Sequence, residues 1–244
     1  MSKQGIVIPR EHGGWAMLII PYVTGVIFSQ ATWVHITLFI AWFFFYLASY
    51  PFLQAVRKSK QRSDWMKWGM IYSVIAVVFL IPSVIGFPKL VYLAPIMLVL
   101  LSINIWHSKQ KSERAWLNDL SAILLFCIGA VAAYWVGGGK WDQNMFMIVL
   151  FNFVYFFGTV FYVKSVFRER TNSRWLIGSK VYHIIQILIP VIVGYPLMLI
   201  PYLFGTVRAF LLGGKQMRPM KVGIIEIVNS IQFLVFTLFL FDLR

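Results

Sequence analysis

A basic segment that closes a long apolar run has residue types and spacing suited to binding an anion. The segment reads FYVKSVFRERTNSRW (161–175) and places Lys164 four residues before Arg168. Residues four apart lie on one face of a helix. Arg binds phosphate or carboxylate through two parallel hydrogen bonds, and Lys binds them as a point charge. With Tyr162 and Arg170 beside them, these cations form a candidate site for an anionic headgroup.

Two further segments carry charge at the ends of apolar runs. FLQAVRKSK (52–60) repeats the pattern of the first segment and contributes Arg57. Near the start, PREHGGWAML places Arg10, Glu11 and His12 directly before a Gly-Gly pair, which allows a ligand or another backbone to approach closely. The alternative for this triplet is a polar helix start. We predict that these four residues also contribute to substrate binding.

Two acidic residues lie about one turn inside apolar runs, namely Asp119 in ERAWLNDLSAILL and Glu226 in KVGIIEIVNSIQF. Ionisable groups at that depth are costly and usually face the interior of a helix bundle or a water-filled cavity. One interpretation is that they pair with basic residues and only fasten helices together. The other is a polar mouth open to the cytoplasm, where the first, fifth, sixth and ninth apolar runs converge.

No metal site or cofactor site is predicted by spacing. The sequence contains no HExxH, CxxC, Walker or GxSxG motif. Haem ligation by two histidines is disfavoured, because His35 is expected on the outer side of the membrane and His12, His107 and His183 on the inner side. Cys127 is the single cysteine, so an intrachain disulfide is excluded.

Composition decides the class of protein that must position these residues. Of the 244 residues, 60% are hydrophobic and only 12% are charged, whereas a soluble domain is roughly 25% charged. The chain is therefore an integral membrane protein, and we expect one polytopic domain over 1–244. The amino terminus lacks the pattern of a cleaved signal peptide, so the first apolar run is expected to remain as a span.

About nine apolar runs have lengths suited to membrane-spanning helices. The runs are 14–29, 33–55, 67–84, 89–106, 117–136, 144–164, 179–194, 196–212 and 222–241. The region 179–212 is too long for one helix, and Gly194 with Pro196 predicts a turn inside it. Eight spans, with a re-entrant pair or a short seventh span, is the rival count. The predicted fold is an all-α membrane bundle.

Lys and Arg are concentrated at every second junction between these runs. All of the 22 Lys and Arg except Lys89, Lys140 and Arg244 fall at the amino terminus or around the junctions that follow the second, fourth, sixth and eighth runs. Loops rich in Lys and Arg stay in the cytoplasm, so the amino terminus is predicted inside and the carboxyl terminus outside. Orientation and attraction to anionic lipid account for the net charge of +14, so no nucleic-acid partner is predicted. The expected location is the inner (plasma) membrane of a bacterium.

Three segments carry a family resemblance over essentially the whole chain. PREHGGWAMLIIP, YVKSVFRERTNSRW and RPMKVGIIEIVNSIQFLVFTLFL resemble the YwiC-like family of bacterial membrane proteins, which implies no particular chemistry. More distantly, nine spans with motifs closing the second and sixth runs are similar to the UbiA family of intramembrane prenyltransferases. That family holds Mg²⁺ and a prenyl diphosphate with Asp-rich motifs at those places. Here only Asp64 and Glu169 lie near them, so Mg²⁺-dependent prenyl transfer is not implied.

Three functions remain open at this point. The first is binding or modifying an anionic lipid or prenyl diphosphate on a UbiA-like scaffold, with membrane lipid as the partner. The second is transport of a small anion or metabolite, which the few polar residues in mid-run, Asn152, Gln186 and Ser121, disfavour. The third is a non-catalytic membrane assembly partner. The sequence does not decide whether the protein is an enzyme.

Overall fold

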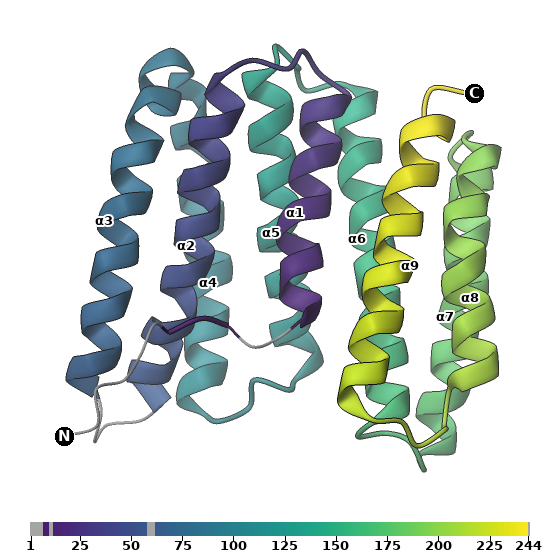
Figure 1. The fold of residues 1–244 in the computed structure, drawn as a ribbon. Helices are drawn as coiled ribbons and strands as arrows, with labels where there is room; N and C mark the ends of the chain where they lie inside the picture. The colour runs from purple at the N-terminus through teal and green to yellow at the C-terminus, as the bar shows by residue number, and fades with distance from the viewer. Residues whose placement is uncertain (1–6, 10–11, 58–61, 244) are drawn as a thin grey trace. The chain divides into compact units, whose positions relative to one another are not determined.

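The structure, a computed structural model, describes residues 7–9, 12–57 and 62–243. Over these residues it contains helices and no strand (Figure 1). The α-helices are α1 (His12–Ile27), α2 (Val34–Arg57), α3 (Arg62–Gly86), α4 (Ala94–Lys109), α5 (Trp116–Val136), α6 (Gln143–Val166), α7 (Ser173–Ile192), α8 (Ile200–Leu212) and α9 (Pro219–Leu240). Short 3₁₀ helices, η2 (Pro88–Leu93) and η3 (Pro196–Leu199), lead into α4 and α8.

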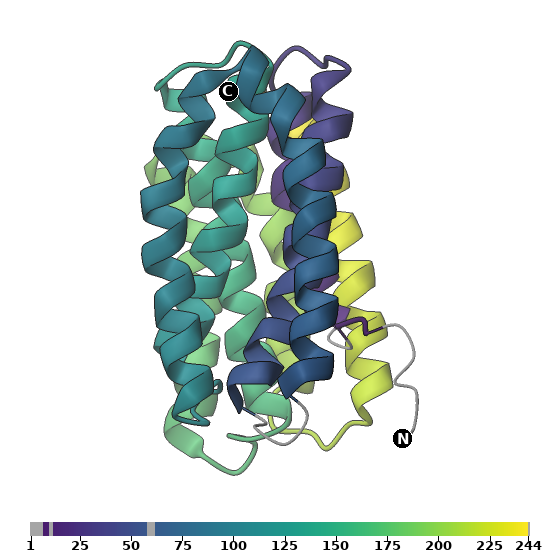
Figure 2. The ribbon, with the colours of Figure 1, turned by 90° about the vertical axis from the view of Figure 1, so that its left-hand side faces the viewer.

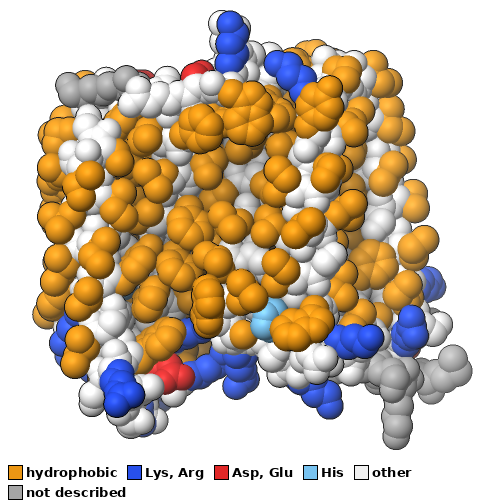
Figure 3. Space-filling model, turned by 180° about the vertical axis from the view of Figure 1, so that it is seen from behind, with side chains coloured by type: hydrophobic (Ala, Val, Ile, Leu, Met, Phe, Trp, Pro, Cys, Tyr) orange, Lys and Arg blue, Asp and Glu red, His pale blue; other side chains and the backbone are white. Residues whose placement is uncertain are grey.

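Most of the helices have the length and composition of membrane spans. Seven helical segments, with η2 and α4 counted as one (Pro88–Lys109), are long and apolar enough to cross a bilayer, and two shorter apolar segments are Gly13–Ile27 and Pro196–Leu212. On the face drawn in Figure 3, hydrophobic side chains cover most of the surface, and Lys and Arg gather near the ends of the helices. The prediction of an all-α membrane bundle is confirmed, while the count of nine spans and the orientation of the termini stay predictions.

The chain divides into two compact units. Unit 1 comprises Met1–Gly14 and Pro21–Val149, and unit 2 comprises Trp15–Ile20 and Leu150–Arg244. In unit 1, α2 lies alongside α3 and also contacts α4 and α5 (Figures 1 and 2). In unit 2, α8 packs against both α7 and α9. The prediction of one domain over 1–244 stays a prediction.

Buried hydrogen bonds of His35 tie α2 to α5 in unit 1. His35 Nδ1 accepts a bond from the Thr32 amide at 3.0 Å, so Nε2 carries the proton and donates to the Ala133 carbonyl at 2.9 Å. Tyr22 in turn donates to the His35 carbonyl at 2.6 Å. Both ring nitrogens are thus occupied by protein groups, which gives His35 a structural role.

The connections of unit 2 bring its two basic loops together. Arg170, after α6, donates to Gln216, before α9, at 3.0 Å. The amide of Gly214 donates to the Ser165 carbonyl at 3.2 Å. Unit 2 therefore has one end, called here its basic end, where α6 and α8 finish, α7 and α9 begin, and most of its Lys and Arg lie.

Candidate functional site

A buried ion pair joins α8 to α9 near the basic end of unit 2. Arg208 Nη1 donates to Glu226 Oε1, and their side chains are only 6% and 9% exposed. At 1.5 Å per residue, Arg208 lies about 6 Å before the end of α8, and Glu226 about 10 Å after the start of α9. Charges buried among apolar helices must be paired. The two side chains therefore fasten the helices and form a polar centre within them.

The Arg208 guanidinium has one nitrogen that bonds to no described residue. The ring of Tyr162 lies under the guanidinium, 4.1 Å from its carbon, and fixes the plane of the group. Nη1 is taken by Glu226, whereas Nε is buried without a hydrogen-bond partner among the described residues. A guanidinium presents its donors as planar forks that match two oxygens of a phosphate or carboxylate. The Nε edge is therefore a preformed contact for an oxyanion.

Uncharged polar side chains extend the site toward the middle of unit 2. Asn229 Nδ2 donates to the Tyr155 hydroxyl at 2.7 Å, and that hydroxyl donates to Ser230 Oγ at 3.3 Å. Gln186 and His183, one turn apart on α7, are 2% and 0% exposed. So many polar groups inside apolar helices are costly unless they bind one another or a ligand.

Three acceptor atoms in this region lack a partner within the described part of the chain. They are Asn229 Oδ1, Gln186 Oε1 and His183 Nε2. His183 Nδ1 lies 2.7 Å from the Ser179 carbonyl, so it carries the proton of the neutral ring and leaves Nε2 as an acceptor. We call the group formed by Tyr155, Tyr162, His183, Gln186, Arg208, Glu226, Asn229 and Ser230 the polar cluster.

Two of the predicted site residues, Tyr162 and Glu226, lie in the polar cluster. Three others lie at the basic end of the same unit. Lys164 Nζ lies 5.7 Å from the centroid of the Trp175 ring, and Arg170 donates to Gln216. Helix α6 ends at Val166, so Arg168 lies just beyond it and is exposed. Its amide still donates to the Lys164 carbonyl at 3.1 Å, which continues the turn.

The remaining predicted residues belong to other parts of the chain. Arg57, in unit 1, forms an ion pair with Glu113 at 3.3 Å, with side chains 44% and 32% exposed. Asp119 lies in the first turn of α5, also in unit 1, and is half-buried. Arg10, Glu11 and the side chain of His12 lie outside the described residues. One mouth shared by all ten residues stays a prediction.

Sequence reasoning missed Arg208, the central cation of the cluster. By its place in the sequence, Arg208 counts as one of the cations that orient the chain. Its neighbours carry a signal that could have found it, because IPYLFGTVRAFLL surrounds it with apolar residues on both sides. A cation at such a position is not needed for orientation and calls for a partner inside the protein.

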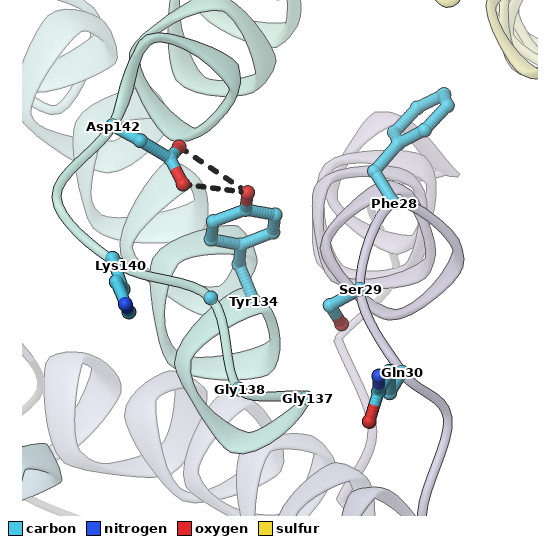
Figure 4. A pocket seen from close by; sticks show the side chains of 9 residues that line it. Phe28, Ser29, Gln30, Tyr134, Gly137, Gly138, Lys140 and Asp142 are labelled. Atoms are coloured by element: carbon cyan, nitrogen blue, oxygen red, sulfur yellow. Dashed lines mark hydrogen bonds between the residues drawn. The ribbon is translucent and has the colours of Figure 1, made fainter.

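A hollow of about 400 Å³ lies in unit 1, where α5 ends and α6 begins (Figure 4). It is lined by Phe28, Ser29, Gln30, Tyr134, Gly137, Gly138, Gly139, Lys140 and Asp142. The Asp142 carboxylate accepts bonds from the Tyr134 hydroxyl at 3.0 and 3.2 Å and from the Met145 amide at 2.9 Å. Asp142 thus caps the start of α6. Within the described residues, no group of three or more His, Cys, Asp or Glu is placed to hold a metal ion.

Comparison with known proteins places the chain in a family. The model of the YwiC-like protein family matches residues 8–134. The chain is 37% identical over 228 residues to "Uncharacterized protein YwiC" of Bacillus subtilis, covering 93% of this chain and 95% of that protein. It is 33% identical over 233 residues to an "Uncharacterized protein" of Haemophilus influenzae, covering 96% and 98%. No solved structure matches the chain. The chain therefore belongs to the YwiC-like family, as its motifs predicted.

Proposed function

We propose that the protein binds the phosphate or carboxylate headgroup of an anionic amphiphile at the basic end of unit 2. The observation that carries this proposal is the buried guanidinium of Arg208, which Glu226 and the Tyr162 ring hold in place while its Nε has no hydrogen-bond partner among the described residues. A desolvated, preoriented guanidinium binds an oxyanion more strongly than an exposed one, because little water must be displaced and little motion is lost.

The surroundings of Arg208 support an amphiphile as the ligand. Lys164, Arg168 and Arg170 lie at the same end of unit 2 and give it a positive field that attracts anions. Beside Arg208 on α8, Val207 and Leu211 are 55% and 61% exposed and offer apolar surface to an acyl or prenyl chain. A headgroup at the guanidinium and a tail along α8 would use both surfaces.

The proposal includes the placement in the membrane. We propose nine spans, an internal amino terminus and an external carboxyl terminus in a bacterial plasma membrane, so that the basic end of unit 2 faces the cytoplasm. The alternation of basic and neutral loops supports this orientation. A UbiA-like scaffold is also part of the proposal, with cations at the places where that family has Asp-rich motifs. Binding is proposed without any step through a metal.

The proposal is tested by mass spectrometry of the lipids that co-purify with the protein. The wild type is expected to retain a phosphorylated lipid or isoprenoid. Arg208→Lys keeps the charge opposite Glu226 but loses the fork, so retention should fall about tenfold. Arg168→Ala should also reduce it by weakening attraction at the entrance, and Lys140→Ala, a cation in unit 1, serves as the control. Equal lipid retention in all four proteins would refute the proposal.

The depth of the polar cluster favours one second candidate, transport of a small anion or metabolite. His183, Gln186 and Asn229 lie near the middle of their helices and are buried. Carriers place polar groups at that depth. Uptake of phosphate or a small carboxylate into vesicles that contain the purified protein, and its loss in Asn229→Leu, would favour transport over lipid binding.

A further inference from the structure

Gly205 on α8 leaves a gap the size of one methyl group, and three polar side-chain nitrogens lie around it. A Cβ atom placed on Gly205 would lie 3.6 Å from Asn229 Nδ2, 3.6 Å from Gln186 Nε2 and 3.8 Å from Arg208 Nη2. These nitrogens come from three helices, α7, α8 and α9. All three therefore gather around one point that the missing side chain leaves open.

Each of the three nitrogens has hydrogen-bonding capacity to offer. Asn229 Nδ2 uses one hydrogen for the Tyr155 hydroxyl and keeps a second. Gln186 Oε1 has no hydrogen-bond partner among the described residues, and the amide nitrogen beside it carries two hydrogens. Arg208 uses Nη1 for Glu226, which leaves Nη2 as well as Nε. The gap is therefore surrounded by donors.

A second glycine makes room for the other end of the Gln186 amide. Its amide oxygen lies against Gly158 of α6, where a Cβ atom would collide with it. Gly158 thus makes room for the oxygen on one side, and the amide nitrogen is directed to Gly205 on the other. The two glycines hold a buried glutamine between α6 and α8 with its donor group facing Arg208 and Asn229.

We propose that the space over Gly205 is an oxyanion-binding subsite, in which one oxygen of the ligand's anionic group accepts bonds from Arg208, Gln186 and Asn229. Convergent donors that are fixed before binding are the usual means of holding an oxyanion away from water. Glu226 offsets much of the charge of the Arg208 guanidinium. The amides of Gln186 and Asn229 are therefore needed as further donors to the anionic group. The inference rests on the proposed function and adds the residues that hold the anionic group. A phosphate or carboxylate fits, from either a lipid headgroup or a free solute.

Gly205→Ala tests the subsite with minimal disturbance. Distances of 3.6–3.8 Å are ordinary van der Waals contacts, so a methyl group fits but fills the gap. Gly178→Ala on α7 is the matched control, because a Cβ there meets no atom within 4 Å. A second variant, Gln186→Glu, nearly keeps the side-chain size and places a carboxylate at the gap. Thermal unfolding in detergent verifies that all variants fold.

The affinity of each protein is measured for two probes, inorganic phosphate and phosphatidic acid in lipid nanodiscs. The wild type should bind at least one probe, and Gly205→Ala and Gln186→Glu should bind it about tenfold or more weakly, as for the loss of a charge-assisted hydrogen bond. Gly178→Ala should stay within about twofold. Binding of phosphatidic acid alone identifies a lipid headgroup, and binding of inorganic phosphate alone identifies a free solute, and both outcomes support the subsite.

Two outcomes overturn the inference, and they differ in what else they overturn. If Gly205→Ala and Gln186→Glu bind like the wild type while Arg208→Lys does not, the subsite over Gly205 is wrong and the proposed function stands. If the wild type binds neither probe, the proposed function is wrong and the subsite is lost with it.

Discussion

Replacing Glu226 by glutamine is expected to destabilise the protein far more than its size suggests. The substitution keeps the shape of the side chain but removes the charge opposite Arg208, whose side chain is 6% exposed. A buried charge without its partner keeps its desolvation cost and loses its Coulomb attraction. The expected loss in the free energy of unfolding is about 3–5 kcal/mol.

Thermal unfolding in detergent measures this loss. For a chain of this length each kcal/mol corresponds to a few degrees, so the midpoint should fall by roughly 6–20 °C. The double variant Arg208→Met with Glu226→Met removes both charges and should unfold near the wild-type temperature or above it. An anion that binds the unpaired guanidinium should also raise the midpoint of Glu226→Gln more than that of the wild type.

A small effect of Glu226→Gln on the free energy of unfolding would contradict a buried ion pair. A cost below about 1 kcal/mol is that of an exposed ion pair. It would mean that Arg208 reaches water and that the polar cluster is open rather than buried. A double variant as unstable as Glu226→Gln would refute the assignment of the cost to unpaired charge.

Three further predictions concern unit 1 and the orientation of the chain. His35→Phe should cost about 1–3 kcal/mol in denaturant unfolding, because it leaves a buried carbonyl unbonded, and an unchanged midpoint would exclude the structural role of the ring. In a Cys127→Ala background, Lys140→Cys should react with an impermeant maleimide in intact cells, because Lys140 is predicted outside. Lys215→Cys, predicted inside, should react only after the cells are permeabilised. The reverse pattern would invert the topology. Arg57→Ala should cost less than about 1 kcal/mol, since its ion pair is half-exposed, and a larger loss would show a buried role.

The positions of the helices could be predicted from sequence because their signals are local. Seven of the nine apolar runs each fall on one α-helix, and the runs 89–106 and 196–212 each begin on a short 3₁₀ helix that leads into an α-helix. The predicted turn within 179–212 is confirmed, since α7 ends at Ile192, Gly194 has a φ of +85° and η3 starts at Pro196. A positive φ and a proline both end a helix through the geometry of single residues. Such signals need no knowledge of the tertiary structure.

The polar cluster could not be predicted in the same way, because it depends on which helix faces meet. Gln186 was noted as one of few polar residues in mid-run, yet nothing in the sequence relates it to Asn229 on another helix. Arg208 resembles a loop cation in the sequence, because α8 is short and Lys215 follows only seven residues later. Only packing of α8 between α7 and α9 turns these scattered residues into neighbours.

The shortness of the segment Pro196–Leu212 has a consequence for the lipid around it. Four residues of 3₁₀ helix and thirteen of α-helix span about 27 Å, whereas the 22 residues of α9 span about 33 Å. In the proposed placement with nine spans, a hydrocarbon core of about 30 Å becomes thinner beside the shorter segment. In that placement, thinning draws the phosphate layer inward at α8, and the lipid itself thereby shortens the distance from the membrane surface to Arg208.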